Sequence, residues 1–371
     1  MMIEDSLFRF SKKISALSNC LNSIYNYKRK RTEVSSLPTL LWIEPTNKCN
    51  LKCVMCPNTQ IPRNELGFMA WETYKKIIDE AKEFASSVYL LLAGESLLHK
   101  EIYSMIRYAR DNNVRPLLNT NGTVLASEEH RNRLLDSGVS HITFAFDGYN
   151  KETYEKIRVG ARYDRVVGGL IEFLKEKKRR RLKEPYVAIT TLEVGIEDYK
   201  DKEAAKREFY RLFEGLPVDE FIRKTPNTWG GTFRETDTFT HHDISTRNYY
   251  PCSHLWSTMS ICWDGTVVPC CFDFFKTYTL GNVNKQSLKE IWNDKPMVAL
   301  RESMLNGTYR DLNKLCIDCV ILHLEPVLGV PAGMRTVVKD TITNIIGMGA
   351  EKYLIKFAKK IKPSYSLGID K

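Results

Sequence analysis

Short apolar runs alternate with helical patterns from Pro38 to about residue 224. The apolar runs predict strands at residues 40–43, 88–92, 115–119, 141–146, 187–192 and 220–222. Apolar side chains recur every three or four residues between them, which predicts helices at residues 71–84, 101–112, 128–137, 165–178 and 202–213. Repeated strand–helix units are typical of α/β folds with a parallel sheet. Six units are fewer than the eight of a closed barrel, so we expect a partial (β/α)6, TIM-like barrel whose site lies at the carboxyl ends of the strands.

The two ends of the chain are basic and amphipathic. Residues 3–26 carry apolar side chains three or four positions apart and precede a basic string at residues 28–31, which predicts a helix within residues 1–35. Residues 323–371 have the same character and predict a helical tail. We expect both ends to pack on the barrel and cap its open side, in preference to docking at an anionic membrane surface.

The partial barrel is expected to span residues 36–235. A polar, glycine-containing segment at residues 225–247 lacks periodicity and marks its end. A small cysteine-rich domain is expected at residues 245–322. Within it, Asp264 and Gly265 stand between two β-prone runs and predict a hairpin.

The composition of the chain indicates the cell compartment and the kind of partner that we expect. No run of eighteen apolar residues and no signal-peptide pattern is present, so we expect a cytoplasmic protein. In that reducing compartment the ten cysteines are expected as metal ligands or buried thiols rather than disulfides. The net charge of +10 favours an anionic partner. The basic run at residues 175–183 lacks interleaved aromatic residues and is expected to be a solvated face, so no nucleic acid partner is expected.

Cys49, Cys53 and Cys56 lie within eight residues, directly after the first expected strand. Only a tight loop lets all three converge on one centre. A structural zinc site would require four protein ligands, and the histidine nearest in the sequence is His99. A [4Fe-4S] cluster held by three thiolates leaves one iron open for an exchangeable ligand. The spacing therefore favours a cluster over zinc.

The pattern Cys-x3-Cys-x2-Cys, on the loop after the first strand of a strand–helix barrel, resembles the radical S-adenosylmethionine (SAM) superfamily. The resemblance implies that the amino and carboxylate groups of the cofactor chelate the open iron. It also implies that the cluster, reduced by a protein such as flavodoxin or ferredoxin, cleaves the cofactor to methionine and a 5'-deoxyadenosyl radical. That radical abstracts hydrogen from a substrate.

Two segments after later strands resemble cofactor-contacting segments of that superfamily. Residues 93–96, Ala-Gly-Glu-Ser, resemble its Gly-Gly-Glu-Pro segment: Gly94 and Glu95 are retained, and the first and last residues differ. The resemblance implies that this segment contacts the cofactor's ammonium group. Residues 119–122 are similar to the family's Thr-Asn-Gly turn, and an ordinary Asn-Gly turn explains them equally well.

Four further residues match cofactor-contacting positions of the family. Ala145 stands where the family normally has a ribose-contacting serine, so a hydroxyl contact is missing or supplied elsewhere. Arg158 matches an arginine used on the cofactor's carboxylate, an anion that its fork of donors suits, and a surface arginine is the alternative. Met55 takes a position that is commonly aromatic and packs on adenine, a role that a thioether can fill. Leu192 is assigned to the same cofactor site.

Cys252, Cys270, Cys316 and Cys319 belong to a second cysteine-rich pattern, over residues 249–322. Its order resembles the SPASM or twitch auxiliary-cluster domain found behind many radical SAM barrels. On that resemblance, these four cysteines hold one auxiliary [4Fe-4S] cluster and leave no iron open. A second auxiliary cluster would need a further run of closely spaced cysteines, which this sequence lacks.

Three cysteines remain outside these sets. Cys262 on the expected hairpin and Cys20 on the apolar stripe of the first helix are expected to be buried thiols. Cys271 either replaces Cys270 as a ligand or faces the substrate.

These features predict a radical SAM enzyme of the oxidoreductase type. An auxiliary cluster near the substrate could accept an electron, which would make the reaction a two-electron oxidation, for instance of a sugar-like or aminocyclitol alcohol. Modification of a ribosomally made peptide is the alternative, although residues 1–35 leave little room for the amino-terminal peptide-binding domain of many such enzymes. A non-catalytic iron-sulfur carrier or scaffold is a third hypothesis, because Ala93, Ser96 and Ala145 depart from the family pattern.

Overall fold

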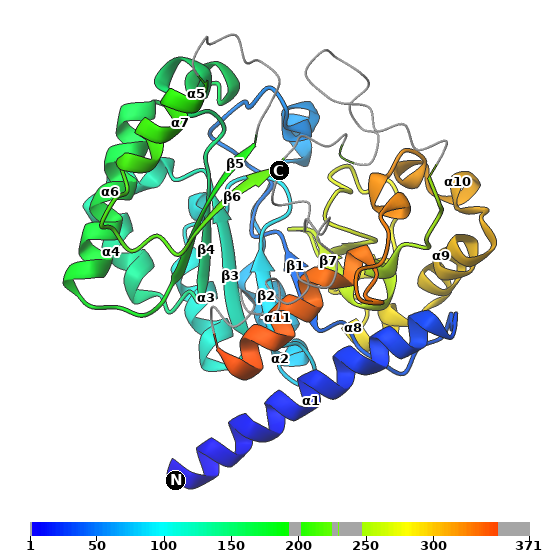
Figure 1. Cartoon of the computed structure of the whole chain (residues 1–371). Helices are drawn as coiled ribbons and strands as arrows, with labels where there is room; N and C mark the ends of the chain where they lie inside the picture. The colour runs from blue at the N-terminus through cyan, green and yellow to red at the C-terminus, as the bar shows by residue number, and fades with distance from the viewer. Residues whose placement is uncertain (1, 193–201, 225–228, 230–246, 348–371) are drawn as a thin grey trace.

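The computed structural model describes residues 2–192, 202–224, 229 and 247–347, with side chains from residue 13 onward. Most of the polar segment expected at residues 225–247, and all of the basic tail beyond residue 347, lie outside these residues. A nine-stranded sheet runs through the described residues (Figure 1).

Six parallel strands form the partial barrel, in the order β6-β5-β4-β3-β2-β1. They are β1 (Leu40–Ile43), β2 (Ser87–Leu90), β3 (Arg115–Thr120), β4 (His141–Ala145), β5 (Tyr186–Leu192) and β6 (Glu220–Lys224). Consecutive strands are neighbours, as in a strand–helix repeat whose crossovers share one hand. Side chains alternate between a face toward the helices and a concave face. The predicted parallel sheet is confirmed, with strand ends that differ by one or two residues.

Five predicted helices cover the outer face of this sheet (Figure 1). They are α2 (Trp71–Ala81), α3 (Ile102–Asp111), α4 (Glu128–Asp136), α6 (Tyr163–Arg179) and α7 (Lys202–Arg211). In α2, one buried face is formed by residues three or four apart, Tyr74, Ile77, Ile78 and Ala81. Burial of such a face stabilises each helix far more than its intrinsic propensity does.

The short helix α5 (Lys151–Ile157) was not predicted. The side chain of Asn150 caps it by accepting from the Thr153 N–H at 2.9 Å, and the helix buries Tyr154 and Ile157. Seven residues are too few to establish a helical period, and the cap was the signal in the sequence.

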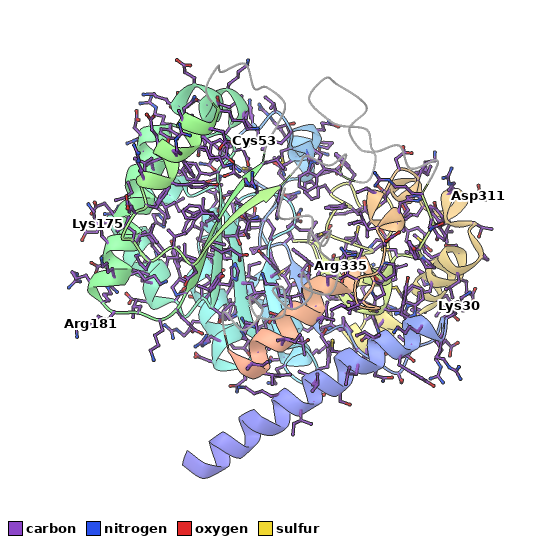
Figure 2. The ribbon with its side chains drawn as sticks, viewed as in Figure 1. Lys30, Cys53, Lys175, Arg181, Asp311 and Arg335 are labelled. Atoms are coloured by element: carbon purple, nitrogen blue, oxygen red, sulfur yellow. The ribbon has the colours of Figure 1, made fainter. Side chains whose placement is uncertain are left out.

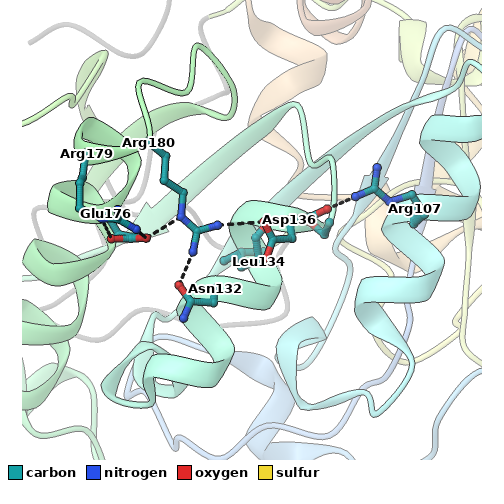
Figure 3. A network of polar contacts seen from close by, with 8 residues as sticks. Arg107, Asn132, Leu134, Asp136, Glu176, Arg179 and Arg180 are labelled. Carbon is teal, nitrogen blue, oxygen red and sulfur yellow. Dashed lines mark hydrogen bonds and ion pairs between the residues drawn. The ribbon is translucent and has the colours of Figure 1, made fainter.

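The basic run at the end of α6 lies in a network of surface ion pairs (Figure 3). The Arg180 guanidinium donates to Glu176 at 2.5 Å, to Asp136 at 2.9 Å and to Asn132 at 2.5 Å. Arg179 is exposed and also pairs with Glu176. Exposed pairs of this kind contribute less than about 1 kcal/mol each. Apart from Lys177, which is buried and pairs with Asp219, the run is therefore a solvated face, as expected.

The cysteine-rich segment continues the sheet beyond β1. Strand β7 (Thr258–Ile261) pairs with β1 in parallel, and β8 (Thr266–Val268) and β9 (Gly281–Asn282) follow antiparallel. The predicted hairpin is confirmed, with Gly265 at φ +84° in its turn. Its continuity with the barrel sheet was not predicted. Helices α8 (Leu288–Trp292), α9 (Lys295–Asn306) and α10 (Tyr309–Leu312) complete this segment.

The terminal helices α1 (Met2–Lys28) and α11 (Arg335–Ile346) pack together beneath the sheet (Figure 1). Asp340 on α11 accepts from the Ser86 and Ser87 hydroxyls at 3.1 and 2.7 Å and pairs with Arg115 at 3.0 Å. Cys20 on α1 is buried beside apolar residues of α11 and the strands. The described parts of both ends therefore pack on the barrel, at the amino ends of the strands.

Candidate active site

The first cysteine loop (residues 44–56) leaves β1 and carries three free, half-buried cysteines. Figure 2 places Cys53 at the end of the barrel where β5 and β6 end. Burial, the largest cause, raises the pKa of Cys49 to about 11 and that of Cys56 to about 12, and neighbouring thiols add to both shifts. Burial also raises the pKa of Cys53. Thiolates at this place therefore need a positive partner, which a metal centre supplies.

Backbone hydrogen bonds fix the first cysteine loop against the end of α5. The Lys52 N–H donates to the Val159 carbonyl at 2.8 Å, and the Val54 N–H donates to the Ile157 carbonyl at 3.0 Å. Because these donors flank Cys53, the two hydrogen bonds fix this part of the loop against α5.

Gly94 brings the loop after β2 against the first cysteine loop. Its φ is +75°, a left-handed conformation that glycine adopts readily. A Cβ at this position would lie 2.4 Å from the Thr46 carbonyl oxygen and 2.7 Å from that of Lys48. The next residue, Glu95, donates its N–H to the same Lys48 oxygen at 2.9 Å. Only glycine lets the two loops approach this closely.

The Glu95 carboxylate joins the loops after β2 and β3. It accepts from the Thr120 hydroxyl at 2.8 Å, the Asn121 N–H at 2.7 Å and the Leu97 N–H at 3.1 Å. Glu95 is only 3% exposed, and burial raises its pKa while these donors oppose the rise. Three donors therefore fix the carboxylate beside the first cysteine loop.

Ala93 and Ser96, the two residues that differ from the family's Gly-Gly-Glu-Pro segment, are both buried. Ser96 donates its hydroxyl to the Leu90 carbonyl at 2.9 Å, and Ala93 is 2% exposed. The serine hydroxyl is satisfied within its own turn, so neither departure leaves an unpaired polar group at the site.

Glu44 was missed by the sequence analysis. Its carboxylate accepts from the Ala93 N–H and from the Trp263 N–H, both at 3.1 Å. Burial raises the pKa of Glu44 to about 7, although these two donors oppose the shift. The side chain thus links the first cysteine loop, the Gly-Glu loop and the cysteine-rich hairpin. An acidic residue directly after a buried strand was the available signal.

Arg158 ends α5 and pairs with Asp147 after β4, at 2.6 Å. Both side chains are buried, so the alternative of a surface arginine is wrong. Burial alone would lower the pKa of Arg158, but Asp147 and Cys53 raise it above its usual range. Asp147 also accepts from the Leu192 N–H at 3.0 Å, and Nε of Arg158 has no partner among the described residues.

Met55 and Ile157 form a small apolar cluster against which Cys53 and Leu192 pack. The Met55 carbonyl accepts from the Trp229 indole at 2.9 Å. This cluster gives the site an apolar wall beside the cysteines. Ala145, the remaining predicted cofactor residue, lies two residues before Asp147 and adds no polar group.

The predicted auxiliary cysteines come together from three segments of the chain. Cys252 precedes the turn at Ser253–Trp256, Cys270 follows β8, and Cys316 and Cys319 lie in consecutive turns after α10. Burial raises the pKa of Cys252 to about 12, and repulsion from Cys319 adds to the shift. Burial and repulsion from Cys252 and Cys319 also raise the pKa of Cys316. The thiols therefore lie close enough to repel one another electrostatically.

Cys271 lies beside this set and interacts electrostatically with Lys224 at the end of β6. Cys271 packs against an apolar cluster that includes Leu92 and Ala93 of the loop after β2, so it lies on the side of the auxiliary cysteines that faces the barrel. Cys262 and Cys20 are 1% and 4% exposed, which confirms both as buried thiols.

The donor sets fit iron-sulfur clusters. Within residues 2–192, 202–224, 229 and 247–347, no three His, Cys, Asp or Glu side chains gather tightly enough to hold a single metal ion. A cluster binds each thiolate through a different iron, so it accepts cysteines that stand further apart. Within the same residues, no helix has the length and apolar character needed to cross a bilayer.

Comparison with known proteins assigns both regions to families. Residues 43–208 match the radical SAM superfamily, and residues 252–320 match SPASM, an iron-sulfur cluster-binding domain. The two matches contain the two cysteine sets described above. These domains imply [4Fe-4S] clusters and SAM as cofactors.

Individual proteins resemble the chain over different lengths. An AdoMet-dependent heme synthase of Methanosarcina barkeri is 31% identical over 138 residues, which are 37% of this chain and only 39% of that protein. A tungsten-containing aldehyde ferredoxin oxidoreductase cofactor-modifying protein of Pyrococcus furiosus is 25% identical over 320 residues, covering 75% of this chain and 86% of that protein.

Among solved structures, Streptococcus suis SuiB bound to the precursor peptide SuiA has the same fold. The TM-score is 0.58, with 16% identity, over 82% of this chain and 75% of SuiB. The two matched domains, the partial barrel and the two cysteine sets together show that the chain belongs to the radical SAM superfamily and carries a SPASM iron-sulfur cluster-binding domain.

Proposed function

We propose that this chain is an enzyme that cleaves SAM reductively and uses the resulting 5'-deoxyadenosyl radical to abstract a hydrogen atom from a substrate. The observation that carries the proposal is the grouping at one end of the barrel of the first cysteine loop, the Gly94–Glu95 pair and the buried Arg158. Their chemistry matches a cofactor that carries a cluster-chelating amino acid group.

In this proposal Cys49, Cys53 and Cys56 hold the first [4Fe-4S] cluster. Glu95, fixed by three donors, supplies a carboxylate for the cofactor's ammonium group. Arg158 supplies Nε, which has no partner among the described residues, for the cofactor's carboxylate. Asp147 orients this arginine and keeps it charged.

Apolar residues serve the adenine in the same proposal. Met55 and Leu192 lie together beside Cys53 and offer a polarizable, water-free wall to a flat ring. Exclusion of water at this wall would protect a reactive carbon radical from side reactions. Ala145 contributes space rather than a polar contact.

Cys252, Cys270, Cys316 and Cys319 hold the auxiliary [4Fe-4S] cluster in this proposal. Four thiolates leave no iron open, so such a cluster would supply electron transfer. The substrate loses a hydrogen atom to the radical, then one electron to the auxiliary cluster and one proton to solvent, which completes a two-electron oxidation. Cys271, on the barrel side of this set, faces the substrate.

The substrate that we propose is a sugar-like or aminocyclitol alcohol. Polar side chains on the concave face support this class, among them Thr143 and Tyr89. Lys224, at the end of β6, is the Cα partner of Leu192 and points to the same concave face, so this cation suits an anionic group on the substrate. A ribosomally made peptide is the alternative substrate.

The test uses anaerobically reconstituted enzyme, dithionite and SAM with a panel of phosphorylated and free sugar alcohols, aminocyclitols and short peptides. A carbonyl product from an alcohol supports the proposal, whereas turnover of peptides alone contradicts it. In a C316S/C319S variant, oxidation should stop while cofactor cleavage continues. Product formed at the normal rate by that variant, in folded form, would refute the electron-acceptor role.

We also propose peripheral contact with an anionic membrane through α1. Its described part exposes one apolar stripe at helical spacing, formed by Ile14, Leu17, Leu21 and Tyr25, which are 39–57% exposed. The basic residues 28–31 follow at the end of the helix. An apolar stripe beside cations is the pattern of helices that lie in a bilayer interface.

The electron donor that we propose is an acidic protein such as flavodoxin or ferredoxin. The net charge of +10 suits such a partner.

A further inference from the structure

Ala145 and Thr190 are Cα partners in the pairing of β4 with β5. Paired residues of neighbouring strands point to the same side of a sheet. Two residues earlier on these strands, Thr143 bonds with the Tyr89 hydroxyl of β2 at 3.5 Å over the concave side of β3, and Ala188 packs against Ile222. Thr190 and Ala145 therefore both point to the concave face.

Two polar atoms on the β3–β5 part of this face have no partner among the described residues. They are Oγ1 of Thr190 and Oδ1 of Asn119, and both are shielded from solvent. Thr190 as a whole is only 7% exposed. By contrast, the Thr143 hydroxyl between them bonds with the His141 imidazole at 3.1 Å. A buried hydroxyl or amide without a hydrogen-bond partner costs about 1–3 kcal/mol of stability, so a ligand that hydrogen-bonds both atoms would remove this cost.

The two atoms lie on the barrel wall below the proposed cofactor groups. Thr190 precedes Leu192 by two residues, or about 6–7 Å of strand. Leu192 packs near Met55 and Cys53, and its N–H bonds Asp147, the partner of Arg158. A hydrogen bond of 2.6 Å from the Phe146 N–H to the Thr190 carbonyl holds the two strands together here.

The chemistry of the pair selects a neutral, hydroxyl-bearing group. An amide oxygen only accepts, whereas a threonine hydroxyl both donates and accepts. An anion would be repelled by the amide oxygen, and a cation would lack a counter-charge. Two adjacent hydroxyls on one ligand would satisfy both atoms, with the Ala145 methyl group leaving room between them.

We propose that Thr190 and Asn119 bind the ribose hydroxyls of SAM, with Thr190 on β5 supplying the hydroxyl that Ala145 on β4 lacks. This inference rests on the proposed function, because it requires SAM against the concave face. It makes Thr190 a binding residue that the sequence motifs do not reveal.

Equilibrium dialysis against the fully reconstituted protein tests this proposal without turnover. SAM and an analogue that lacks both ribose hydroxyls are the two ligands. We expect T190V to bind SAM about tenfold more weakly than the wild type, since one buried hydrogen bond is worth about 1 kcal/mol or more. We expect T190S to retain the affinity, and A145S to restore it in the T190V background. The analogue should bind the wild type and T190V equally.

Thr191→Val is the matched control. The next residue along β5 is equally buried but points to the opposite face, so its variant should bind SAM as the wild type does. Iron content shows that each variant carries its clusters. Unchanged SAM affinity in T190V, or an equal loss for SAM and the analogue, overturns the proposal. Failure of the cluster-loaded wild type to bind SAM at all would instead refute the proposed function.

Discussion

Gly94→Ala tests whether contact between the first cysteine loop and the Gly-Glu loop shapes the site. The new Cβ would lie 2.4 Å from the Thr46 carbonyl oxygen and 2.7 Å from the Asn47 carbonyl carbon. The left-handed φ of +75° costs about 1–2 kcal/mol for a residue with a side chain. Displacing packed backbone adds about 1–3 kcal/mol. We expect the free energy of unfolding to fall by about 2–5 kcal/mol.

Gly215→Ala is the matched control for this variant. Gly215 has nearly the same φ, +74°, but an added Cβ meets no atom within 4 Å. It should therefore lose only the cost of the left-handed backbone. Urea unfolding of the reduced apo-protein measures both stabilities, and iron per chain after anaerobic reconstitution measures cluster binding. We expect G94A alone to lose iron. Equal stability and equal iron content in the two variants would show that this close contact between the loops does not shape the site.

Three further predictions concern pH, the terminal helices and the membrane. Burial raises the pKa of Glu44 to about 7 from an ordinary 4.5, so wild-type stability should fall by an amount on the order of 3 kcal/mol as pH rises between these values. Urea titrations should find this slope largely absent in E44Q, and an unchanged slope would contradict the assignment. Asp340→Ala should lower the free energy of unfolding by about 2–4 kcal/mol, because it removes an ion pair and two serine hydrogen bonds that hold α11 on the sheet. A loss of less than about 0.5 kcal/mol in urea unfolding would contradict this role of Asp340. The wild type should float with anionic liposomes and L17E/L21E should not, whereas equal recovery at the bottom of the gradient would count against membrane contact.

Local patterns in the sequence predicted most of the barrel. The strand and helix periods are repeated in a fixed order, so the parallel sheet followed from them. The hairpin at Asp264 and Gly265 was equally clear, because its turn chemistry is local. The parallel pairing of β7 with β1 was not predictable in this way, since it joins residues more than 200 positions apart and leaves no local signature.

The candidate site was predicted where a motif marks it and missed where only the fold assembles it. The cysteine loop, Gly94 and Glu95 are contiguous motifs, so their residues could be named in advance. Glu44 became visible only when its two backbone donors, from distant segments, were in place. Thr190 differs from an ordinary strand threonine only in lacking a partner, which is a property of the packed barrel.

In the proposed function, the first cysteine loop supports cleavage of SAM. The most direct measurement is the release of 5'-deoxyadenosine by the anaerobically reconstituted protein with dithionite and SAM. A variant with Cys49, Cys53 and Cys56 replaced by alanine, which keeps the auxiliary cysteines, is the control. We predict 5'-deoxyadenosine from the wild type and none above background from the variant. No release from fully cluster-loaded wild type would contradict the proposed cleavage of SAM and favour a non-catalytic iron-sulfur carrier.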